Sequence, residues 1–151
     1  FADEGQLRRL LQALRGAGFT FDDEEVRTQI EMRGFLRVYY PAASGARLWT
    51  DIVLAATEFE ERVWRRRWVG HAEALEVSVV SPEDFLLLKV LARRPKDLED
   101  IRSLMTRRGA DLDREYLRKA VGDLAALAHR SDLPAHLEMV LRGELPPPAP
   151  E

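Results

Sequence analysis

The run SPEDFLLLKVLARRPKDLEDIRSL, residues 81–104, combines one lysine with acids in a spacing that could do chemistry. From Phe85 to Ala92 every residue except Lys89 is apolar, and a helix that is apolar on all sides is a buried one. A lysine in such a helix must reach an anion, reach water or lose its charge. Asp97 and Asp100 are three residues apart and share a helix face. The run therefore predicts a buried cation close to two carboxylates, which either forms a structural ion pair with them or neutralises the charge of a bound phosphate.

A second acid that could do chemistry is Asp51, in the run RLWTDIVLA. Alternation in Arg47–Ala55 predicts a strand on which Asp51 lies between apolar neighbours of its own face. Such an acid is either a carboxylate at a strand edge, paired with Arg37 or Arg47, or a catalytic carboxylate held on a rigid strand. The residues by themselves leave both interpretations open.

Together these two runs resemble the polymerase-β-like nucleotidyltransferase superfamily. The pattern S-P-E-D-(apolar)-K-(apolar)-R-x-K-D-x-x-D is similar to that of AbiEii-type and minimal nucleotidyltransferases, several of which are toxins of toxin–antitoxin or phage-defence pairs. The resemblance covers residues 1–104 and is most specific in the two runs. It implies an α+β fold, with a small mixed sheet that contains an antiparallel hairpin, packed with helices, and a C-terminal helical subdomain.

The resemblance also implies roles for individual residues. Asp51 corresponds to the third catalytic carboxylate, which is also a metal ligand. Lys89 and Lys96 correspond to nucleotide-binding residues, and Asp97 and Asp100 support the site from behind it. The ion such chemistry uses is Mg²⁺, a hard ion that takes oxygen ligands.

The function implied by the resemblance is transfer of a nucleotide from a nucleoside triphosphate to an RNA, tRNA or protein acceptor, with an antitoxin or another protein as a partner. The superfamily's Gly-Gly or Gly-Ser helix start and its Asp-x-Asp strand are absent from these 151 residues. Because the chain opens with Phe1, we expect that motif immediately upstream, and we expect this chain by itself to be inactive. The alternative is a non-catalytic copy of the fold that binds a partner protein.

Composition sets wider limits. The formal net charge is −3, which provides no overall field that favours nucleic acid. The absence of cysteine excludes disulfides and thiolate metal sites, and we expect a cytoplasmic protein. No apolar run reaches the length of a membrane span, so we expect no membrane partner.

One basic cluster stands apart from this balance. Glu58–Trp68 is predicted to be a helix, with Trp64 and Trp68 as neighbours on one face and four arginines around them, Arg62, Arg65, Arg66 and Arg67. Basic residues interleaved with aromatics can bind a nucleic-acid backbone. The alternative is a solvated helix face whose arginines pair with acids or stack on tryptophan.

The elements that position these residues follow from periodicity. An amphipathic helix and a short second helix precede a hairpin of Phe35–Pro41 and Arg47–Ala55, and Leu75–Val80 is a further strand. Four helices follow. We expect an α+β core over 1–80, a helical subdomain over 81–143 and a disordered proline-rich tail over 144–151.

Overall fold

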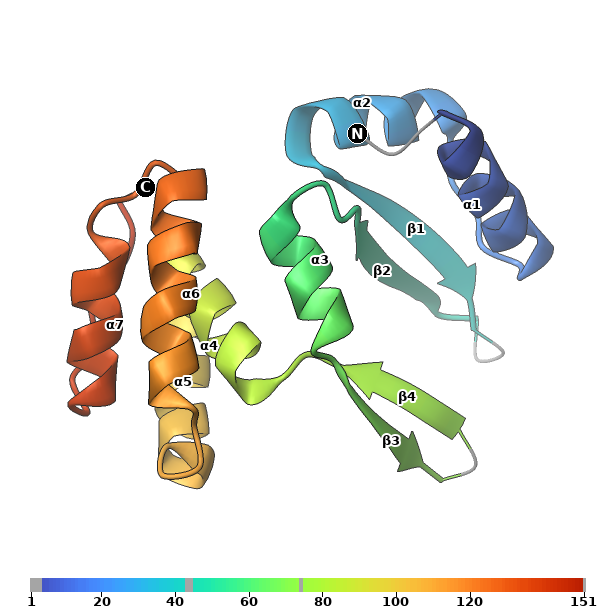
Figure 1. Cartoon of the computed structure of the whole chain (residues 1–151). Helices are drawn as coiled ribbons and strands as arrows, with labels where there is room; N and C mark the ends of the chain where they lie inside the picture. Colours follow the sequence, from blue (N-terminus) through green and yellow to red (C-terminus); the bar gives the residue numbers. More distant parts are fainter. Residues whose placement is uncertain (1–3, 43–44, 74, 151) are drawn as a thin grey trace. The chain divides into compact units, whose positions relative to one another are not determined.

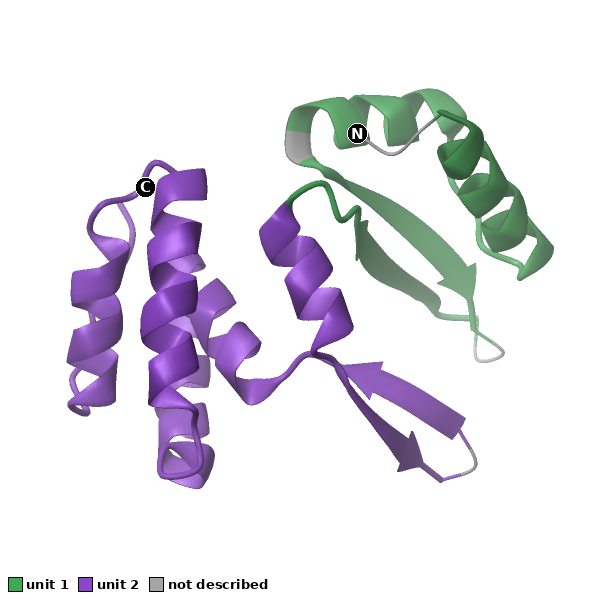
Figure 2. Cartoon of the chain, viewed as in Figure 1, with its two compact units in different colours: residues 1–57 green, residues 58–151 purple. Residues whose placement is uncertain are grey.

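The computed structural model describes residues 4–42, 45–73 and 75–150, and the chain divides into two compact units (Figure 2). Unit 1 spans Phe1–Thr57 and unit 2 spans Glu58–Glu151. From the sequence we expected the core to extend to residue 80, whereas the division lies before the helix that precedes Trp68. Each unit is described by itself.

Unit 1 consists of two helices followed by a hairpin (Figure 1). In chain order its elements are α1 (Glu4–Gly16), α2 (Asp23–Arg33), β1 (Phe35–Pro41) and β2 (Arg47–Val53). The start of α2 is fixed by Asp22, whose carboxylate accepts hydrogen bonds from the backbone N–H groups of Glu24 and Glu25. Its end is at Gly34, whose φ of 70° lies in the left-handed region that glycine tolerates best.

The predicted antiparallel hairpin of β1 and β2 is confirmed. Leu36 and Val38 point to one face, where both are fully buried against apolar residues of the two helices, Leu11, Val26 and Ile30. Because side chains alternate along a strand, residues with odd numbers occupy the opposite, open face. The helices therefore cover one face of this two-stranded sheet, and the packing they provide holds the other face in place.

Unit 2 begins with α3 (Glu58–Arg65) and a second antiparallel hairpin, β3 (Trp68–Ala72) and β4 (Leu75–Val79). The predicted strand after residue 75 is confirmed, but the predicted helix ends earlier than expected. Trp68 lies in β3 opposite Val79, so Trp68 and Trp64 are not neighbours on one helix. The strand at Trp68 depends on pairing with residues further along the chain, which local periodicity does not reveal.

Four helices complete unit 2, as predicted (Figure 1): α4 (Pro82–Ala92), α5 (Pro95–Arg108), α6 (Arg114–Leu127) and α7 (Leu133–Leu141). The start of α4 has a local cause, because the Ser81 hydroxyl accepts a hydrogen bond from the backbone N–H of Asp84 and Pro82 occupies the first helical position. The helices share one apolar core, whose fully buried members include Leu86, Leu87, Ile101, Leu117, Leu133 and Leu137.

The proline-rich stretch after residue 143 was expected to be a disordered tail. In its described part, residues 144–150, the backbone N–H of Ala149 donates to the carbonyl of Arg93 at 3.1 Å. The Arg93 guanidinium in turn donates to the carbonyl of Pro147 at 3.3 Å, and Leu145 packs against the helical core. This segment is therefore bonded to the junction between α4 and α5.

The predicted α+β class is confirmed, with strands early and helices late in the chain. In the described residues the strands form two separate two-stranded antiparallel sheets, where we expected one small mixed sheet. None of the helices described here has both the length and the apolar character that a membrane crossing requires.

Candidate functional site

Asp51 lies on β2, on the open face of the first hairpin. Its cross-strand partner is Arg37, and the guanidinium donates two hydrogen bonds to the carboxylate, Nε to Oδ1 at 2.7 Å and Nη2 to Oδ2 at 2.8 Å. These hydrogen bonds lower the pKa of Asp51 below its usual range, so the carboxylate is ionised at neutral pH. The same guanidinium lies over the ring of Trp49, 4.4 Å from its centre.

Gln29 of α2 helps to set this geometry. Its side-chain oxygen accepts a hydrogen bond from the backbone N–H of Arg37 at 2.7 Å, which ties β1 to the helix behind the sheet. The side-chain amide of Gln29 donates to Glu25 at 2.8 Å, so Gln29 is itself held in place. Packing and this polar tie both position Arg37, and Arg37 positions Asp51.

Of the two interpretations of Asp51, the arginine pair is the one the geometry shows. Arg37 provides it, whereas Arg47 lies over the ring of Tyr39. Among the described residues β2 pairs with β1 alone, so Asp51 lies on a strand of a two-stranded sheet. A catalytic role for Asp51 requires that the pair can open, and 32% of its side chain is exposed.

The described residues do not fit the expected Mg²⁺ site. Both oxygens of Asp51 are hydrogen-bonded to Arg37, and nowhere in residues 4–42, 45–73 and 75–150 do three acidic or histidine side chains gather as metal ligands. A single occupied carboxylate is too small a ligand set for a pair of ions that share several oxygens. We derive no chemical step through a metal.

Lys89 of α4 forms the predicted buried ion cluster. Its ammonium nitrogen lies 2.8 Å from Oδ1 of Asp97 and 2.6 Å from Oδ2 of Asp100, both on α5. Only 18% of the lysine side chain and 1% of the Asp97 side chain are exposed. The prediction of a largely buried lysine paired with these two acids is confirmed.

Asp97 also fixes the start of α5. Its Oδ2 accepts hydrogen bonds from the backbone N–H and the Nε of Arg94, at 3.0 Å and 2.7 Å. These bonds with Arg94, and that with Lys89, hold the pKa of Asp97 far below its usual range. Two carboxylates neutralise Lys89, which leaves it little charge for a phosphate. Lys96, in the first turn of α5, is exposed.

A polar network around Asp84 was missed by the sequence reasoning. Asp84 is fully buried, and it accepts hydrogen bonds from Ser81 at 2.7 Å, from Arg66 at 3.3 Å and from the hydroxyl of Tyr116. Burial and the bond to Asp84 raise the pKa of Tyr116, so the phenol stays protonated as a donor. The sequence carried only the capping signal at residues 81–84, because the other two donors come from α6 and from just after α3.

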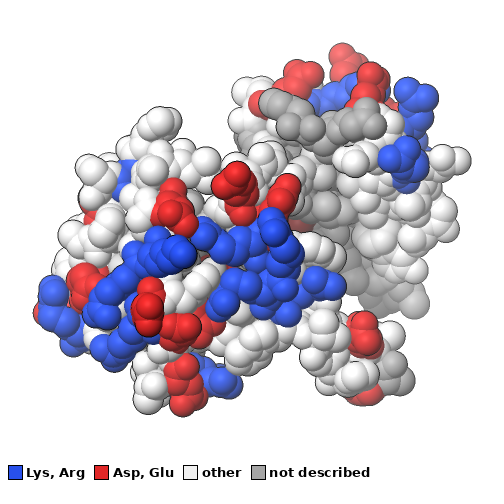
Figure 3. Space-filling model, in the orientation of Figure 1, with Lys and Arg blue, Asp and Glu red and all other residues white. Residues whose placement is uncertain are grey.

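The arginines of the basic cluster at α3 are bound to acids or stacked on aromatic rings, and Arg62 and Arg66 are partly buried by these contacts. Arg62 pairs with Asp123 of α6 at 2.8 Å, Arg65 pairs with Glu61, and the Arg66 guanidinium lies over the Tyr116 ring. Figure 3 shows lysine and arginine side chains gathered over α3 and α6 with acids among them. These pairs favour the structural interpretation of the cluster over nucleic-acid binding.

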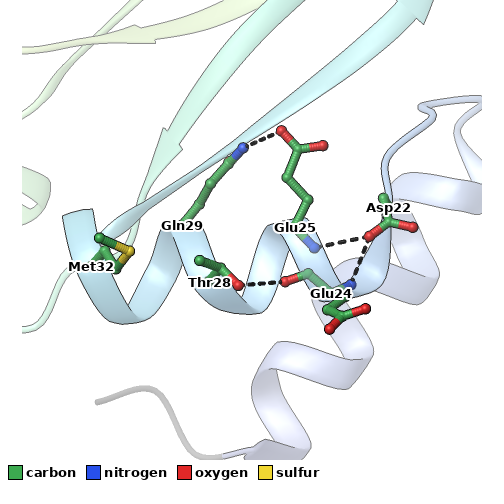
Figure 4. Close-up of a pocket in the computed structure, with 6 residues that line it drawn as sticks. All are labelled: Asp22, Glu24, Glu25, Thr28, Gln29 and Met32. Atoms are coloured by element: carbon green, nitrogen blue, oxygen red, sulfur yellow. Dashed lines mark hydrogen bonds between the residues drawn. The ribbon is translucent and has the colours of Figure 1, made fainter.

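A hollow of about 530 Å³ lies along α2, and Figure 4 shows six residues that line it. Its polar groups are bonded within the helix: Thr28 donates to the carbonyl of Glu24, and Asp22 caps the first turn. The acids at this helix start stabilise the positive end of the helix dipole and need no ligand to explain them.

Comparison with known proteins gives one match. A family model described as "Nucleotidyl transferase AbiEii toxin, Type IV TA system" matches residues 4–150, nearly the whole chain. No curated protein and no solved structure matches. The family match extends through α5, α6 and α7, beyond the stretch in which the sequence resemblance was seen.

Proposed function

Because the chain belongs to the AbiEii family of nucleotidyltransferase toxins of type IV toxin–antitoxin systems, we propose that it serves the transfer of a nucleotide from a nucleoside triphosphate to an RNA, tRNA or protein acceptor. The family also implies an antitoxin counterpart for this chain. The observation that carries the proposal is the position of Asp51: an ionised carboxylate on a strand, facing solvent, within a chain that matches the family over 4–150.

Asp51 is the catalytic group of this proposal. When Arg37 is displaced, its carboxylate becomes free to accept a hydrogen bond or a proton from an attacking hydroxyl group, as a general base does. The exposed ion pair of Asp51 and Arg37 is weak enough to open, since exposed pairs contribute only about 0–1 kcal/mol. Mg²⁺ belongs to the chemistry that the resemblance implies, and because the described residues offer it only Asp51, no step of this proposal depends on the ion.

The two lysines take different parts in the proposal. Lys96 is exposed and carries an available positive charge, which suits direct contact with a phosphate. Lys89 is held by Asp97 and Asp100, so it suits a positioning role in which the cluster fixes α4 against the start of α5. Both lysines belong to unit 2, whereas Asp51 belongs to unit 1.

A second candidate function is a non-catalytic module that binds a partner protein. The second hairpin favours it, because large apolar side chains are exposed on both of its strands: Val69 on β3, and Leu75 and Val79 on β4. A two-stranded hairpin with exposed apolar residues gains stability when another surface covers it.

The experiment compares nucleotide transfer by Asp51→Asn and by the parent. Residues 1–151, and any longer product that the gene encodes, are incubated with labelled nucleoside triphosphates, Mg²⁺ or Mn²⁺, and RNA, tRNA or protein acceptors. Asp123→Asn is the matched control, because it removes an exposed acid that also pairs with one arginine. We expect incorporation by an active form to be lost in Asp51→Asn and kept in the control.

Two outcomes would redirect the proposal. Incorporation that survives Asp51→Asn removes Asp51 from the catalytic role. Absence of incorporation from every form of the protein supports the non-catalytic partner-binding module instead. We expect no incorporation by residues 1–151 alone, since the described residues supply a single candidate metal ligand.

A further inference from the structure

The open face of the first hairpin carries an unusual set of side chains, which we call the aromatic–arginine face. It consists of Arg37, Tyr39, Arg47, Trp49 and Asp51. The strand register places Tyr39 opposite Trp49 and Arg37 opposite Asp51, so these four residues form two adjacent cross-strand pairs. All five have odd numbers, and they therefore point away from the buried face that packs against the helices.

Each aromatic ring on this face has an arginine over it. The Arg37 guanidinium lies 4.4 Å from the centre of the Trp49 ring, and that of Arg47 lies 3.9 Å from the centre of the Tyr39 ring. A guanidinium that lies over an aromatic ring is held there by a cation–π attraction. The face thus presents two flat guanidinium groups, each over an aromatic ring; that of Arg37 is also paired with Asp51, and a ligand phosphate would have to displace this carboxylate.

Burial in the core of unit 1 does not account for this arrangement. The core of unit 1 lies on the other face, where Leu36 and Val38 are fully buried. Trp49 remains 61% exposed, so it contributes little apolar burial despite being the largest side chain available. Exposed tryptophans mark interaction surfaces, and the arginines on this face favour a flat ligand that carries negative charge.

The distribution of charge on unit 1 also favours an anionic ligand on the open face. The aromatic–arginine face carries two arginines and one aspartate; Asp51 pairs with Arg37, and Arg47 lies over the Tyr39 ring. The acidic run 22–25 belongs to the first turn of α2, whose apolar side packs on the opposite face of the sheet. An anionic ligand would approach the open face without meeting that run.

We propose that the aromatic–arginine face binds unpaired nucleotides of a single-stranded nucleic acid. Unpaired bases stack on aromatic rings and on arginine planes, and their phosphates pair with the same guanidinium groups. In a duplex the base faces are already stacked on one another, so they cannot stack on these rings. The proposal deepens the proposed function by naming the class of acceptor, and it rests on that function only for the use to which the bound strand is put.

Asp51 lies beside Trp49 on this face, which links the two proposals geometrically. A strand that stacks on Trp49 brings its sugar and phosphate groups next to the Asp51 carboxylate. Its phosphates would compete with Asp51 for Arg37, and a loss of that partner would free the carboxylate. Binding of the strand and release of the general base would then be coupled.

Binding is measured apart from catalysis. Three tryptophans are present in the chain, so a Trp64→Phe/Trp68→Phe variant leaves Trp49 as the sole fluorescent indole. Oligo-uridine, oligo-deoxythymidine and a mixed-sequence duplex are titrated against it at low and high salt. We expect both single strands to quench Trp49 fluorescence, with affinity that falls as salt rises, and the duplex to bind much more weakly.

Affinity is then compared among single variants by anisotropy of labelled oligo-uridine. We expect Trp49→Ala to lose about 5-fold to 100-fold in affinity, and Trp49→Phe to retain most of it, because each stacked base is worth that much. Trp68→Ala is the matched control, since Trp68 is also exposed and also has an arginine, Arg108, over its ring. Arg47→Gln tests the same face without removing an aromatic side chain.

The proposal is overturned if Trp49→Ala and Arg47→Gln both bind oligo-uridine like the parent, or if Trp68→Ala loses as much affinity as they do. Equal binding of the duplex would also overturn it, because it would show charge attraction without stacking. Asp51→Asn separates the two proposals, because we expect it to keep strand binding. An active form of the protein that still transfers nucleotide as Asp51→Asn refutes the catalytic role of Asp51, and its binding of oligo-uridine then leaves this inference standing.

Discussion

Replacing Lys89 and its partners tests whether the ion cluster between α4 and α5 is structural. Asp97 is 1% exposed and accepts hydrogen bonds from Lys89 and from Arg94. Asp97→Ala removes this buried carboxylate and leaves both partners without their acceptor. Breaking a buried pair from one side costs about 3–5 kcal/mol. Asp97→Asn keeps an acceptor for the Arg94 backbone N–H and loses only the charge, so we expect about 1.5–3 kcal/mol.

Lys89→Met should cost less than Asp97→Ala. It leaves Asp97 with its bonds to Arg94, and the partly exposed Asp100 can turn to solvent. We expect the free energy of unfolding to fall by about 1–3 kcal/mol, because Asp97 loses one hydrogen bond to a charged group. The double variant Lys89→Met/Asp97→Asn should be less destabilised than the sum of the two, with a coupling of about 0.5–3 kcal/mol.

The assay is urea unfolding of residues 1–151, monitored by circular dichroism. The control is Lys96→Met, at an exposed lysine, which should change the free energy of unfolding by less than about 0.5 kcal/mol. The pKa of Asp97 is lowered in the folded state, so its contribution is present above its ordinary value near 3.8 and is lost as the pH falls below that value. If Lys89→Met matches the Lys96 control in stability but lowers nucleotide affinity, Lys89 contacts a phosphate directly and the structural argument is wrong.

Three further predictions concern other polar groups. Tyr116→Phe removes one donor from the buried Asp84 and should cost about 1–3 kcal/mol in urea unfolding, while Asp84→Asn should cost at least as much. Burial and a neighbouring arginine lower the pKa of His136, so the unfolded chain takes up a proton first as the pH falls. The parent should therefore lose more stability than His136→Gln from about pH 7.5 to about pH 5.5. Arg37→Gln removes the main cause of the low pKa of Asp51, which should rise in a carboxylate NMR titration and stay unchanged in an Arg65→Gln control.

The parts of the fold that were predictable are those with a local cause. The first hairpin follows from two runs of β-branched and aromatic residues around a short loop, and the start of α4 follows from Ser81 and Pro82. The partners of Lys89 were predictable as well, because a lone cation in an apolar helix needs an anion and only two acids follow at helical spacing. In each case neighbouring residues carry the physical reason.

The parts that were missed depend on residues far apart in the chain. Trp68 continues a helical pattern and becomes part of β3 only because β4 offers it a strand partner. Asp84 is a capping acid within its own helix, and its partners Arg66 and Tyr116 are 18 and 32 residues away. No local pattern distinguishes a capping acid in water from one buried in such a network, since the difference is tertiary packing.

The two acid–cation groups that the sequence singled out differ in burial, and the difference separates their roles. The Lys89 cluster is buried and its carboxylates neutralise the lysine, so opening it would strand charge in the core at a cost of several kcal/mol. The Asp51–Arg37 pair lies on an open face with about a third of each side chain exposed, where water replaces a lost partner cheaply. A reaction needs a carboxylate that can exchange one partner for another within its cycle. On these grounds we assign the proposed chemistry to Asp51, and Lys89 and Asp97 belong to the framework that holds α4 and α5 together.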